Sequence, residues 1–128
     1  MAERRSAVRR IEARVLEAEL RLFRVSSARD DGAFLDSLRS HYELDRPPRG
    51  PEARAAVIHM GLSMFDRREV ATELARRVPK LGGHVATVDL MPGLGVCIAK
   101  TGGAAHWSVW GRPPQLAECV TDVEIAER

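Results

Sequence analysis

After one clear amphipathic helix, the last third of the chain consists mainly of short strand-like runs, and this order constrains the fold more than any other feature. The runs are HVATVDL (84–90), GVCIAKT (95–101), HWSVWG (106–111) and TDVEI (121–125). Their alternating or β-branched composition is typical of strands. A long alternation of strands and helices, which would indicate a parallel sheet, is absent. We therefore expect an α+β fold with a small split or antiparallel β-sheet core and flanking helices.

The helix before these strands has the clearest helical periodicity in the chain. Its apolar positions recur at three- and four-residue steps: Val70, Ala71, Leu74, Ala75 and Val78. Asp66 followed by Glu69 resembles a capping box and predicts where the helix begins. Pro79 and the pair Gly82-Gly83 predict where it ends.

The first part of the chain predicts an additional N-terminal helix over residues 4–20. Apolar residues recur there at helical spacing, and arginines occupy the opposite face. The segment LFRVSS (22–27) then alternates as a short strand does. We expect a single domain over residues 1–128, with the N-terminal amphipathic helix at 1–21 and the α+β core at 22–125.

Between this strand and the amphipathic helix, three further elements are expected. Asp30 or Asp31 predicts the cap of a short helix that runs through Leu38. The segment LDRPPRGPEA (44–53) carries three prolines and a glycine, which is typical of a surface loop. The segment VIHMGLSMF (57–65) predicts the next strand.

The charge balance argues against a general polyanion-binding function. The 128 residues carry a net charge of +2, with 30% charged and 45% hydrophobic residues, as in ordinary globular proteins. All but Lys80 and Lys100 of the 20 basic residues are arginine, but they are interleaved with Asp and Glu and form no aromatic-basic stripe. Nucleic acid is therefore not an expected partner.

The two cysteines and the apolar segments indicate which cellular compartment to expect and whether to expect a metal site. Cys97 and Cys119 have neither CxxC pairing nor a histidine at ligand spacing, so we expect no metal site and a reducing cytoplasm. The N-terminus lacks the apolar run of a signal peptide, and the uncharged apolar stretch 90–99 is short and broken by Pro92. No membrane association is expected.

The common catalytic motifs are incomplete in this chain. The segment GLSMF (61–65) lacks the second glycine of G-x-S-x-G, so a hydrolase nucleophile elbow is not expected. Cys97 and His106 could pair on neighbouring strands, but the apolar surroundings of Cys97 favour a buried packing role. Neither GxGxxG nor a Walker A sequence is present.

The segment HWSVWG concentrates both tryptophans of the chain in one strand. A period of two places His106, Ser108 and Trp110 on one face, and Trp107 with Val109 on the other. We expect Trp107 in the core. The opposite face could form a wall for a planar ligand such as nicotinamide or a base. The alternative is a half-buried strand on which Trp110 covers the neighbouring proline loop.

The order of these pieces resembles the ADP-ribosyltransferase fold. The resemblance is carried by a strand with Arg24 in LFRV, a later strand with Ser63 in GLSMF, a helix beginning DRREVA, and then strands with a C-terminal turn. The chain is also similar to small uncharacterised bacterial proteins with the pattern FRV…GxSxF…LGxxVAxVxL…HxxxWG. Together these resemblances cover about residues 22–125.

The resemblance implies roles for individual residues. In the arginine-serine-glutamate class of these transferases, the first-strand Arg holds an NAD phosphate, a Ser braces the pocket, and a Glu near the last strands stabilises the oxocarbenium-like transition state. Arg24 and Ser63 would take the first two roles. The segment WGRPPQLAECV has no E-x-E or Q-x-E. Gln115 and Glu118 are its only polar candidates for the role of the catalytic Glu. This departure favours nucleotide binding over NAD cleavage.

Two functions from different classes remain open. The first is an ADP-ribosyltransferase-like protein, a toxin or a metabolic modifier, that binds NAD and transfers ADP-ribose to an acceptor. Its catalytic candidates are Arg24, Ser63 and His106, and its cofactor contacts are Arg24, Ser63, Ser108 and Trp110. The second is a non-catalytic protein-binding or assembly module. It would bind a partner, or a second copy of itself, through residues 4–20.

Overall fold

The structure is a computed structural model that describes residues 13–29, 34–38, 61–103 and 105–126. Seven strands form one sheet in the order β1-β5-β6-β3-β2-β4-β7, and all neighbouring strands are antiparallel. The strands are β1 (Arg14–Val15), β2 (Leu20–Ser26), β3 (Leu62–Phe65), β4 (His84–Leu90), β5 (Cys97–Lys100), β6 (His106–Trp110) and β7 (Val120–Ile125). The expected α+β class with an antiparallel sheet is confirmed.

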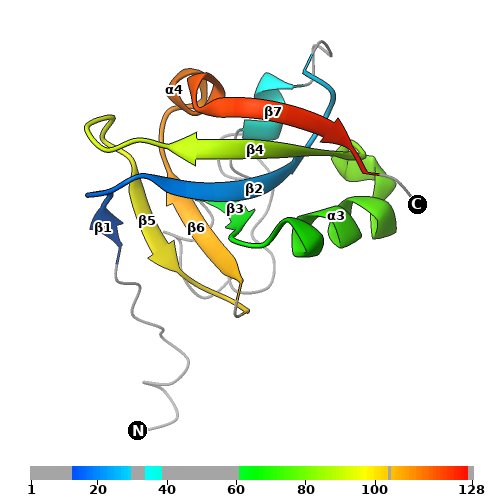
Figure 1. The fold of residues 1–128 in the computed structure, drawn as a ribbon, viewed down its shortest axis with the longest axis horizontal. Helices are drawn as coiled ribbons and strands as arrows, with labels where there is room; N and C mark the ends of the chain where they lie inside the picture. The colour runs from blue at the N-terminus through cyan, green and yellow to red at the C-terminus, as the bar shows by residue number, and fades with distance from the viewer. Residues whose placement is uncertain (1–12, 30–33, 39–60, 104, 127–128) are drawn as a thin grey trace, which may run out of the picture.

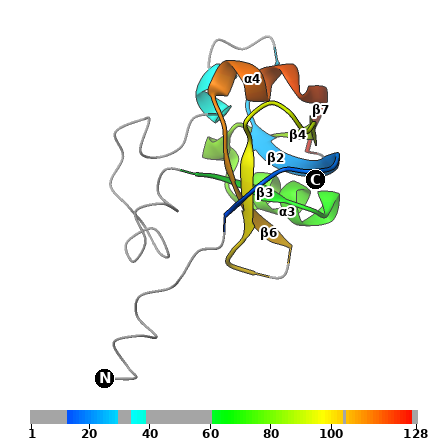
Figure 2. The same cartoon turned by 90° about the vertical axis from the view of Figure 1, so that its left-hand side faces the viewer.

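Within the described residues, two α-helices and two 3₁₀ turns accompany the sheet. They are η1 (Leu35–Leu38), α3 (Arg68–Arg77), η3 (Pro79–Leu81) and α4 (Pro113–Glu118). Helix α3 packs on β2, β3 and β4, whereas α4 contacts η1 and β7. In Figure 1, β5 and β6 run steeply across the direction of β2, β4 and β7, as expected of a strongly twisted sheet. Figure 2 shows α4 beside η1 and well separated from α3.

The core is divided between the two faces of the sheet. The larger cluster includes Leu22, Met64, Val88 and Val109, and Leu116 of α4 packs into it. The smaller cluster lies under α3: Val25, Ala71, Ala75 and Val85, with Phe23, Phe65 and Leu74 packed against it. Because successive strand residues point to opposite faces, each central strand contributes alternate residues to the two clusters.

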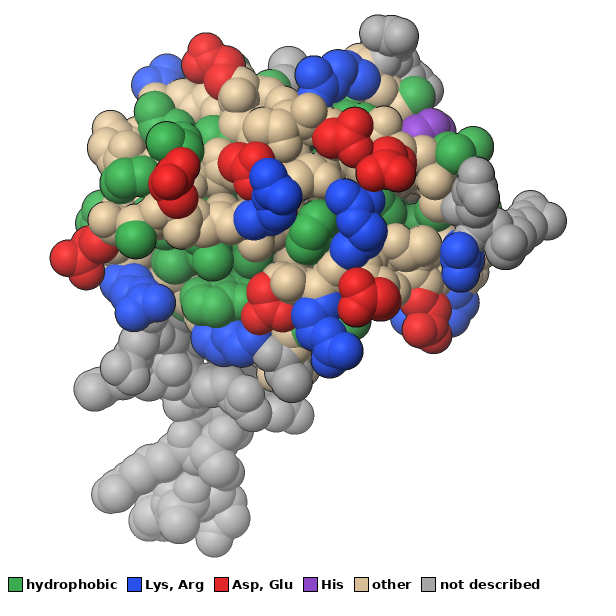
Figure 3. Space-filling view, viewed as in Figure 1, with side chains coloured by type: hydrophobic (Ala, Val, Ile, Leu, Met, Phe, Trp, Pro, Cys, Tyr) green, Lys and Arg blue, Asp and Glu red, His purple; other side chains and the backbone are tan. Residues whose placement is uncertain are grey.

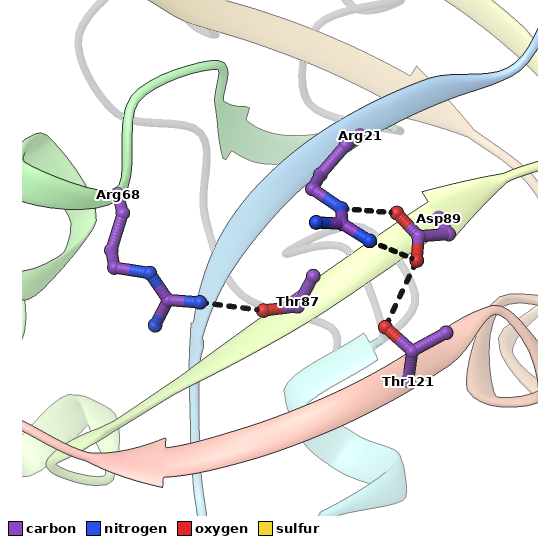
Figure 4. Close-up of polar contacts among 5 residues, drawn as sticks. All are labelled: Arg21, Arg68, Thr87, Asp89 and Thr121. Carbon is purple, nitrogen blue, oxygen red and sulfur yellow. Dashed lines mark hydrogen bonds and ion pairs between the residues drawn. The ribbon is translucent and has the colours of Figure 1, made fainter.

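Polar cross-strand contacts cover the part of the α3 face formed by β2, β4 and β7. Arg21 donates to both carboxylate oxygens of Asp89, at 2.6 and 3.0 Å, and Thr121 donates to the same carboxylate at 3.0 Å (Figure 4). The hydrogen bond from Arg21 holds the pKa of Asp89 below its usual value. These contacts join three neighbouring strands on an exposed surface.

Arg68 ties the first turn of α3 to the same strands. Its guanidinium donates to Thr87 at 3.1 Å (Figure 4). It also donates to Glu124 at 3.0 Å and lies 5.0 Å from the centre of the Phe23 ring. Figure 3 shows basic and acidic side chains interspersed over this face of the molecule. The visible face therefore carries no broad patch of one sign.

The expected helix over residues 4–20 is wrong in its described part. Arg14 and Val15 form β1 and pair with β5, Leu16 donates its N–H to the carbonyl of Val96 at 3.0 Å, and β2 already begins at Leu20. Val15, one of the apolar residues that suggested this helix, is 59% exposed. The edge of β5 offers backbone partners to this segment, and tertiary pairing outweighs its helical periodicity. The rest of this helix lies outside the described residues, so its role as a contact surface stays a prediction.

The predicted capping box at the start of α3 is also wrong. The N-cap residue is Arg67, and no side chain caps the helix. The carboxylate of Asp66 instead accepts hydrogen bonds from Trp107 Nε1 at 3.0 Å and Lys100 Nζ at 3.1 Å. These contacts, with the bond from Trp107 the largest cause, lower the pKa of Asp66. Asp66 thus bonds to side chains of β5 and β6 and not to the first-turn amides of α3.

The expected end of α3 is confirmed. The helix stops at Arg77, and Pro79 begins the 3₁₀ turn η3. Gly82 then takes a left-handed conformation with φ +119°, and a Cβ at this position would collide with the backbone carbonyl of Ser26. Only glycine satisfies both conditions.

The remaining element predictions differ in outcome. The strand over residues 84–90 is β4 with the same bounds, whereas β5 is shorter than the predicted run 95–101. The helix expected after Asp30 or Asp31 is seen only as the 3₁₀ turn η1. The loop at 44–53 and the start of the strand at 57–65 lie outside the described residues.

Candidate functional site

The sheet is split between β2 and β3. Every residue of β2 from Leu20 to Ser26 pairs with β4, and every residue of β3 pairs with β6. Between β2 and β3, both of which are fully described, the only register pair is Phe23 with Phe65. The half-sheets β1-β5-β6-β3 and β2-β4-β7 are therefore joined by one register pair, and we call the boundary between them the β2–β3 split.

Arg24, the residue after this joining pair, bridges the split. Its Nη1 donates a hydrogen bond of 2.7 Å to the carbonyl oxygen of Ser63 in β3, and its Nε donates one of 2.8 Å to the carbonyl oxygen of Ser37 in η1. In a continuous ladder a strand carbonyl accepts from the backbone of its neighbour, but here the donor is a side chain. These two bonds hold the guanidinium across the boundary between the half-sheets.

Ser63 presents its carbonyl to Arg24 and its hydroxyl to the α3 face of the sheet. Its neighbours Leu62 and Met64 are buried in the larger cluster, whereas Phe65 packs into the smaller cluster under α3. Strand alternation places the side chain of Ser63 on the same face as that of Phe65. The side chain is exposed there. The contact between the two predicted residues thus runs through the main chain of Ser63.

Ser108 lies opposite Ser63 on β6, on the same face. It is 2% exposed, and its hydroxyl lies 2.7 Å from that of Thr101. The structure therefore places this predicted cofactor contact inside a hydrogen-bonded hydroxyl pair between β5 and β6.

His106 lies beside the joining pair of phenylalanines. It is registered with Phe65, and the two rings meet edge to face with centroids 5.4 Å apart. Its Nδ1 lies 2.9 Å from the carbonyl oxygen of Thr101. Burial lowers the pKa of His106, and the positive charges of Arg24 and Lys100 lower it further. The ring is therefore neutral at pH 7.

The two tryptophans occupy opposite faces of β6, as the period of two predicts. Trp110 lies against β3, where a Cβ on Gly61 would come within 3.0 Å of the indole. Trp107 packs against the larger cluster but is only half-buried, because its Nε1 reaches Asp66 and Lys100 Nζ lies 5.0 Å from the centre of its ring. Trp107 therefore packs on the core, as predicted, but its side chain is only partly buried.

Three predicted side chains stand apart from the β2–β3 split. Cys97 is registered with Trp110, which places it at the other end of the β5–β6 hairpin from His106. Gln115 and Glu118 belong to α4 and lie on none of the strands β2, β3 and β6. Glu118 instead lines an open groove of about 640 Å³ with Arg21 and Asp89. Neither residue supplies a carboxylate to these three strands.

Three residues that sequence reasoning missed help to build the site. Phe65 joins the half-sheets and packs on His106, Thr101 holds the His106 ring, and Ser37 anchors Arg24. The alternation in GVCIAKT and the glycines after it could have indicated Thr101 as the end of a hairpin strand. The sequence around Ser37 carries no comparable signal.

The described residues contain no group of three or more His, Cys, Asp or Glu side chains placed to hold a metal ion. Within the same residues, no helix has the length and apolar character needed to cross a bilayer. Comparison with known proteins found no matching protein-family model, curated protein or solved structure.

Proposed function

We propose that the β2–β3 split binds NAD or a related nucleotide, as the resemblance to ADP-ribosyltransferases implies, with Arg24 contacting the phosphates. The observation that carries the proposal is the placement of the Arg24 guanidinium, held by Ser37 and Ser63 at the point where the half-sheets part. A guanidinium held by two hydrogen bonds at the edge of a strand suits a phosphate, which it binds through paired, charge-assisted hydrogen bonds.

The energetics favour an exchange of partners at Arg24. In the structure, Nη1 donates to the neutral carbonyl of Ser63. The charge of the guanidinium already strengthens this bond, and a phosphate would add the opposite charge and a second acceptor for the fork. A phosphate that displaces the Ser63 carbonyl would therefore gain more than it removes, while the bond from Nε to Ser37 continues to orient the guanidinium.

The surrounding side chains suit the rest of a nucleotide. Ser63 offers an exposed hydroxyl on the α3 face, and the half-buried Trp110 lies farther along the same face of β6. An indole can stack on a planar base or on nicotinamide. His106 lies on this face as well, beside Phe65. Arg24 lies between Phe23 and Val25 of the smaller cluster and therefore points to the opposite face of the sheet, towards η1. A nucleotide that contacts Arg24 and these residues together would have to pass between β2 and β3.

Binding is better supported than transfer of ADP-ribose. Cleavage of NAD develops positive charge at the ribose carbon, and a nearby carboxylate would stabilise it. Strands β3 and β6 contain no Asp or Glu, and Asp66, which follows β3, is engaged by Trp107 and Lys100. The proposal therefore centres on nucleotide binding, with transfer as a separate question for experiment.

Calorimetric titration of the full chain with NAD and with ADP-ribose tests the proposal. We expect Arg24→Lys, which keeps the charge but loses the fork, to weaken both ligands about tenfold, since hydrogen bonds between charged groups contribute about 1.5–3 kcal/mol. Arg76→Ala is the matched control, because Arg76 is exposed on α3. Circular dichroism would establish that each variant is folded.

The outcomes separate binding from chemistry. If the folded wild-type chain binds neither ligand at millimolar concentration, or if Arg24→Lys and Arg76→Ala bind alike, the proposal is wrong. Release of nicotinamide from NAD by the wild type, reduced in Arg24→Lys, would extend the function to transfer. Binding without nicotinamide release would limit it to nucleotide recognition.

A further inference from the structure

Strand β7 forms one edge of the seven-stranded sheet. It is the last strand in the order, and among residues 13–29, 34–38, 61–103 and 105–126 the only strand that pairs with it is β4. Figure 1 shows β7 along a rim of the sheet, on the far side of β4 from β2. Unpaired backbone groups on the outer side of an edge strand are a template for a further strand.

The register with β4 identifies which backbone groups of β7 face outwards. Ala126, just beyond the strand, donates its N–H to the carbonyl of Gly83 at 2.9 Å, which makes these two a hydrogen-bonded pair. In an antiparallel ladder, hydrogen-bonded pairs alternate with non-hydrogen-bonded ones. Counting back along β7, Glu124 therefore bonds to β4, whereas Val123 and Ile125 direct their N–H and C=O groups away from it.

The side chains of β7 divide between two chemically different faces. Glu124 is registered with Val85, which lies in the smaller cluster under α3. Strand alternation places Asp122 on the same face. Val123 packs against the larger cluster on the opposite face, where Ile125 is 66% exposed. The edge therefore presents acids on one face and apolar side chains on the other.

The two acids can each accept a cation from the outer side. The carboxylate of Asp122 is exposed and has no hydrogen bond or ion pair within the described part of the chain. Glu124 contacts Arg68 through Oε1 at 3.0 Å, and its side chain is 58% exposed. Towards an added strand, both acids occupy non-hydrogen-bonded positions, where the Cα atoms of antiparallel partners are closest, at about 4.5 Å. A basic side chain on that strand would meet them at short range.

A second copy of β7 is a poor partner for this edge. When Val123 lies opposite the same residue of an antiparallel copy, Asp122 of each chain lies opposite Glu124 of the other. Like charges directly opposite each other destabilise a pair of strands. The edge therefore favours a strand of different sequence that carries basic residues at these positions.

We propose that the β7 edge docks an extended segment of a partner protein in which basic and apolar residues alternate. The segment adds an antiparallel strand: its apolar residues exchange backbone hydrogen bonds with Val123 and Ile125, and its basic residues lie opposite the two acids. The added strand starts beyond Val120, because Arg29 already donates to the carbonyl of that residue at 2.9 Å. Since β4 separates β7 from β2, this docking site is independent of the proposed nucleotide site.

A synthetic peptide of alternating arginine and valine, blocked at both ends, is the probe. In the full chain it should slow amide hydrogen exchange at Val123 and Ile125, whereas exchange at Glu124, whose N–H already bonds to β4, should change little. One control peptide replaces arginine by glutamate. Another carries N-methyl groups on its valines, which keeps the charge but removes the N–H donors. Equal binding of either control, or no binding of the probe at millimolar concentration, would overturn the proposal.

Substitutions in the protein separate edge pairing from general charge attraction. Asp122→Asn should weaken the arginine-valine peptide about two- to fivefold, in line with the loss of one exposed cross-strand ion pair. Glu69→Gln is the matched control, because it removes an exposed carboxylate from α3 and should leave the affinity unchanged. No effect of Asp122→Asn, or an equal effect of both variants, would contradict the proposal. Sedimentation of the full chain tests the other occupant: a dimer that the peptide dissociates would assign the edge to a second copy, and the proposed partner would be wrong.

Discussion

Arg24 connects parts of the chain that the ladder of backbone hydrogen bonds leaves separate. Its two main-chain acceptors belong to η1 and β3, while its own backbone belongs to β2. A lysine could supply one donor direction but not the fixed fork that reaches both carbonyls. In the proposed function, the same fork would bind the phosphate.

His106 should make stability depend on pH. Burial lowers its pKa in the folded state below the ordinary value of 6.5, which the unfolded ring retains. The unfolded state therefore binds the proton more readily, and this contribution to stability is fully present above about pH 6.5 and is lost as pH falls through the folded pKa. Urea unfolding at a series of pH values between 7.5 and 5 would measure the loss.

Two histidine substitutions test this pH prediction, one at His106 itself and one at His84 as the control. His106→Asn should flatten the dependence of unfolding free energy on pH in this window. His84→Asn, at the first residue of β4, should leave the slope attributed to His106 in place. Equal slopes in the wild type and His106→Asn would show that protonation of His106 does not oppose folding.

At the scale of elements, α3 begins without a side-chain cap. The backbone of its N-cap residue, Arg67, has the extended conformation typical of that position, with φ −127° and ψ 124°. Arg67→Ser would place a hydroxyl where it can accept from the first-turn amides, and we expect a gain of about 1 kcal/mol. For a chain of this size, that gain corresponds to a rise in melting temperature of about 3–5 °C.

The control for the cap is Arg76→Ser, because this arginine is exposed in the last turn of the same helix. The substitution there offers no cap and should be neutral or slightly destabilising. A thermal melt that shows no difference between the two variants would indicate that first-turn amides of α3 gain nothing from a side-chain cap.

Elements with a complete local signal were predictable from the sequence. Strand β4 has strong strand propensity and follows a glycine stop, and α3 has both a periodic apolar face and Gly82 at its end. Strand β1 was not predictable, because its two residues are extended only by pairing with β5, which a helical pattern cannot show. Asp66 was misassigned as a cap for the same reason, since its partners come from distant strands.

The connections between the predicted site residues could not be predicted from the sequence. Arg24, Ser63 and His106 were named from the sequence, and the structure places them on the neighbouring strands β2, β3 and β6. The sequence could not show that Arg24 meets the carbonyl of Ser63, or that Ser108 is buried against Thr101. Such contacts depend on strand order and register, which local patterns leave open.

At the scale of the whole molecule, two half-sheets share a core but almost no backbone ladder. The larger cluster contains Leu22 from one half and Met64 from the other, so burial of apolar side chains holds the halves together. The backbone junction consists of the Phe23–Phe65 pair and the bridge made by Arg24. Local opening should therefore begin at this junction, where fewest hydrogen bonds must break.

Amide hydrogen exchange tests this weakness in the absence of any ligand. Arg24→Ala should reduce protection of the β3 amides more than that of the β4 amides, because β4 keeps its complete pairing with β2 and its pairing with β7. Arg21→Ala is the matched control: it breaks the exposed pair with Asp89 inside one half-sheet and leaves the junction intact. Uniform loss of protection over β3 and β4 in Arg24→Ala would mean that the halves open as one unit. In that case the Arg24 bridge would not be the point at which the sheet divides.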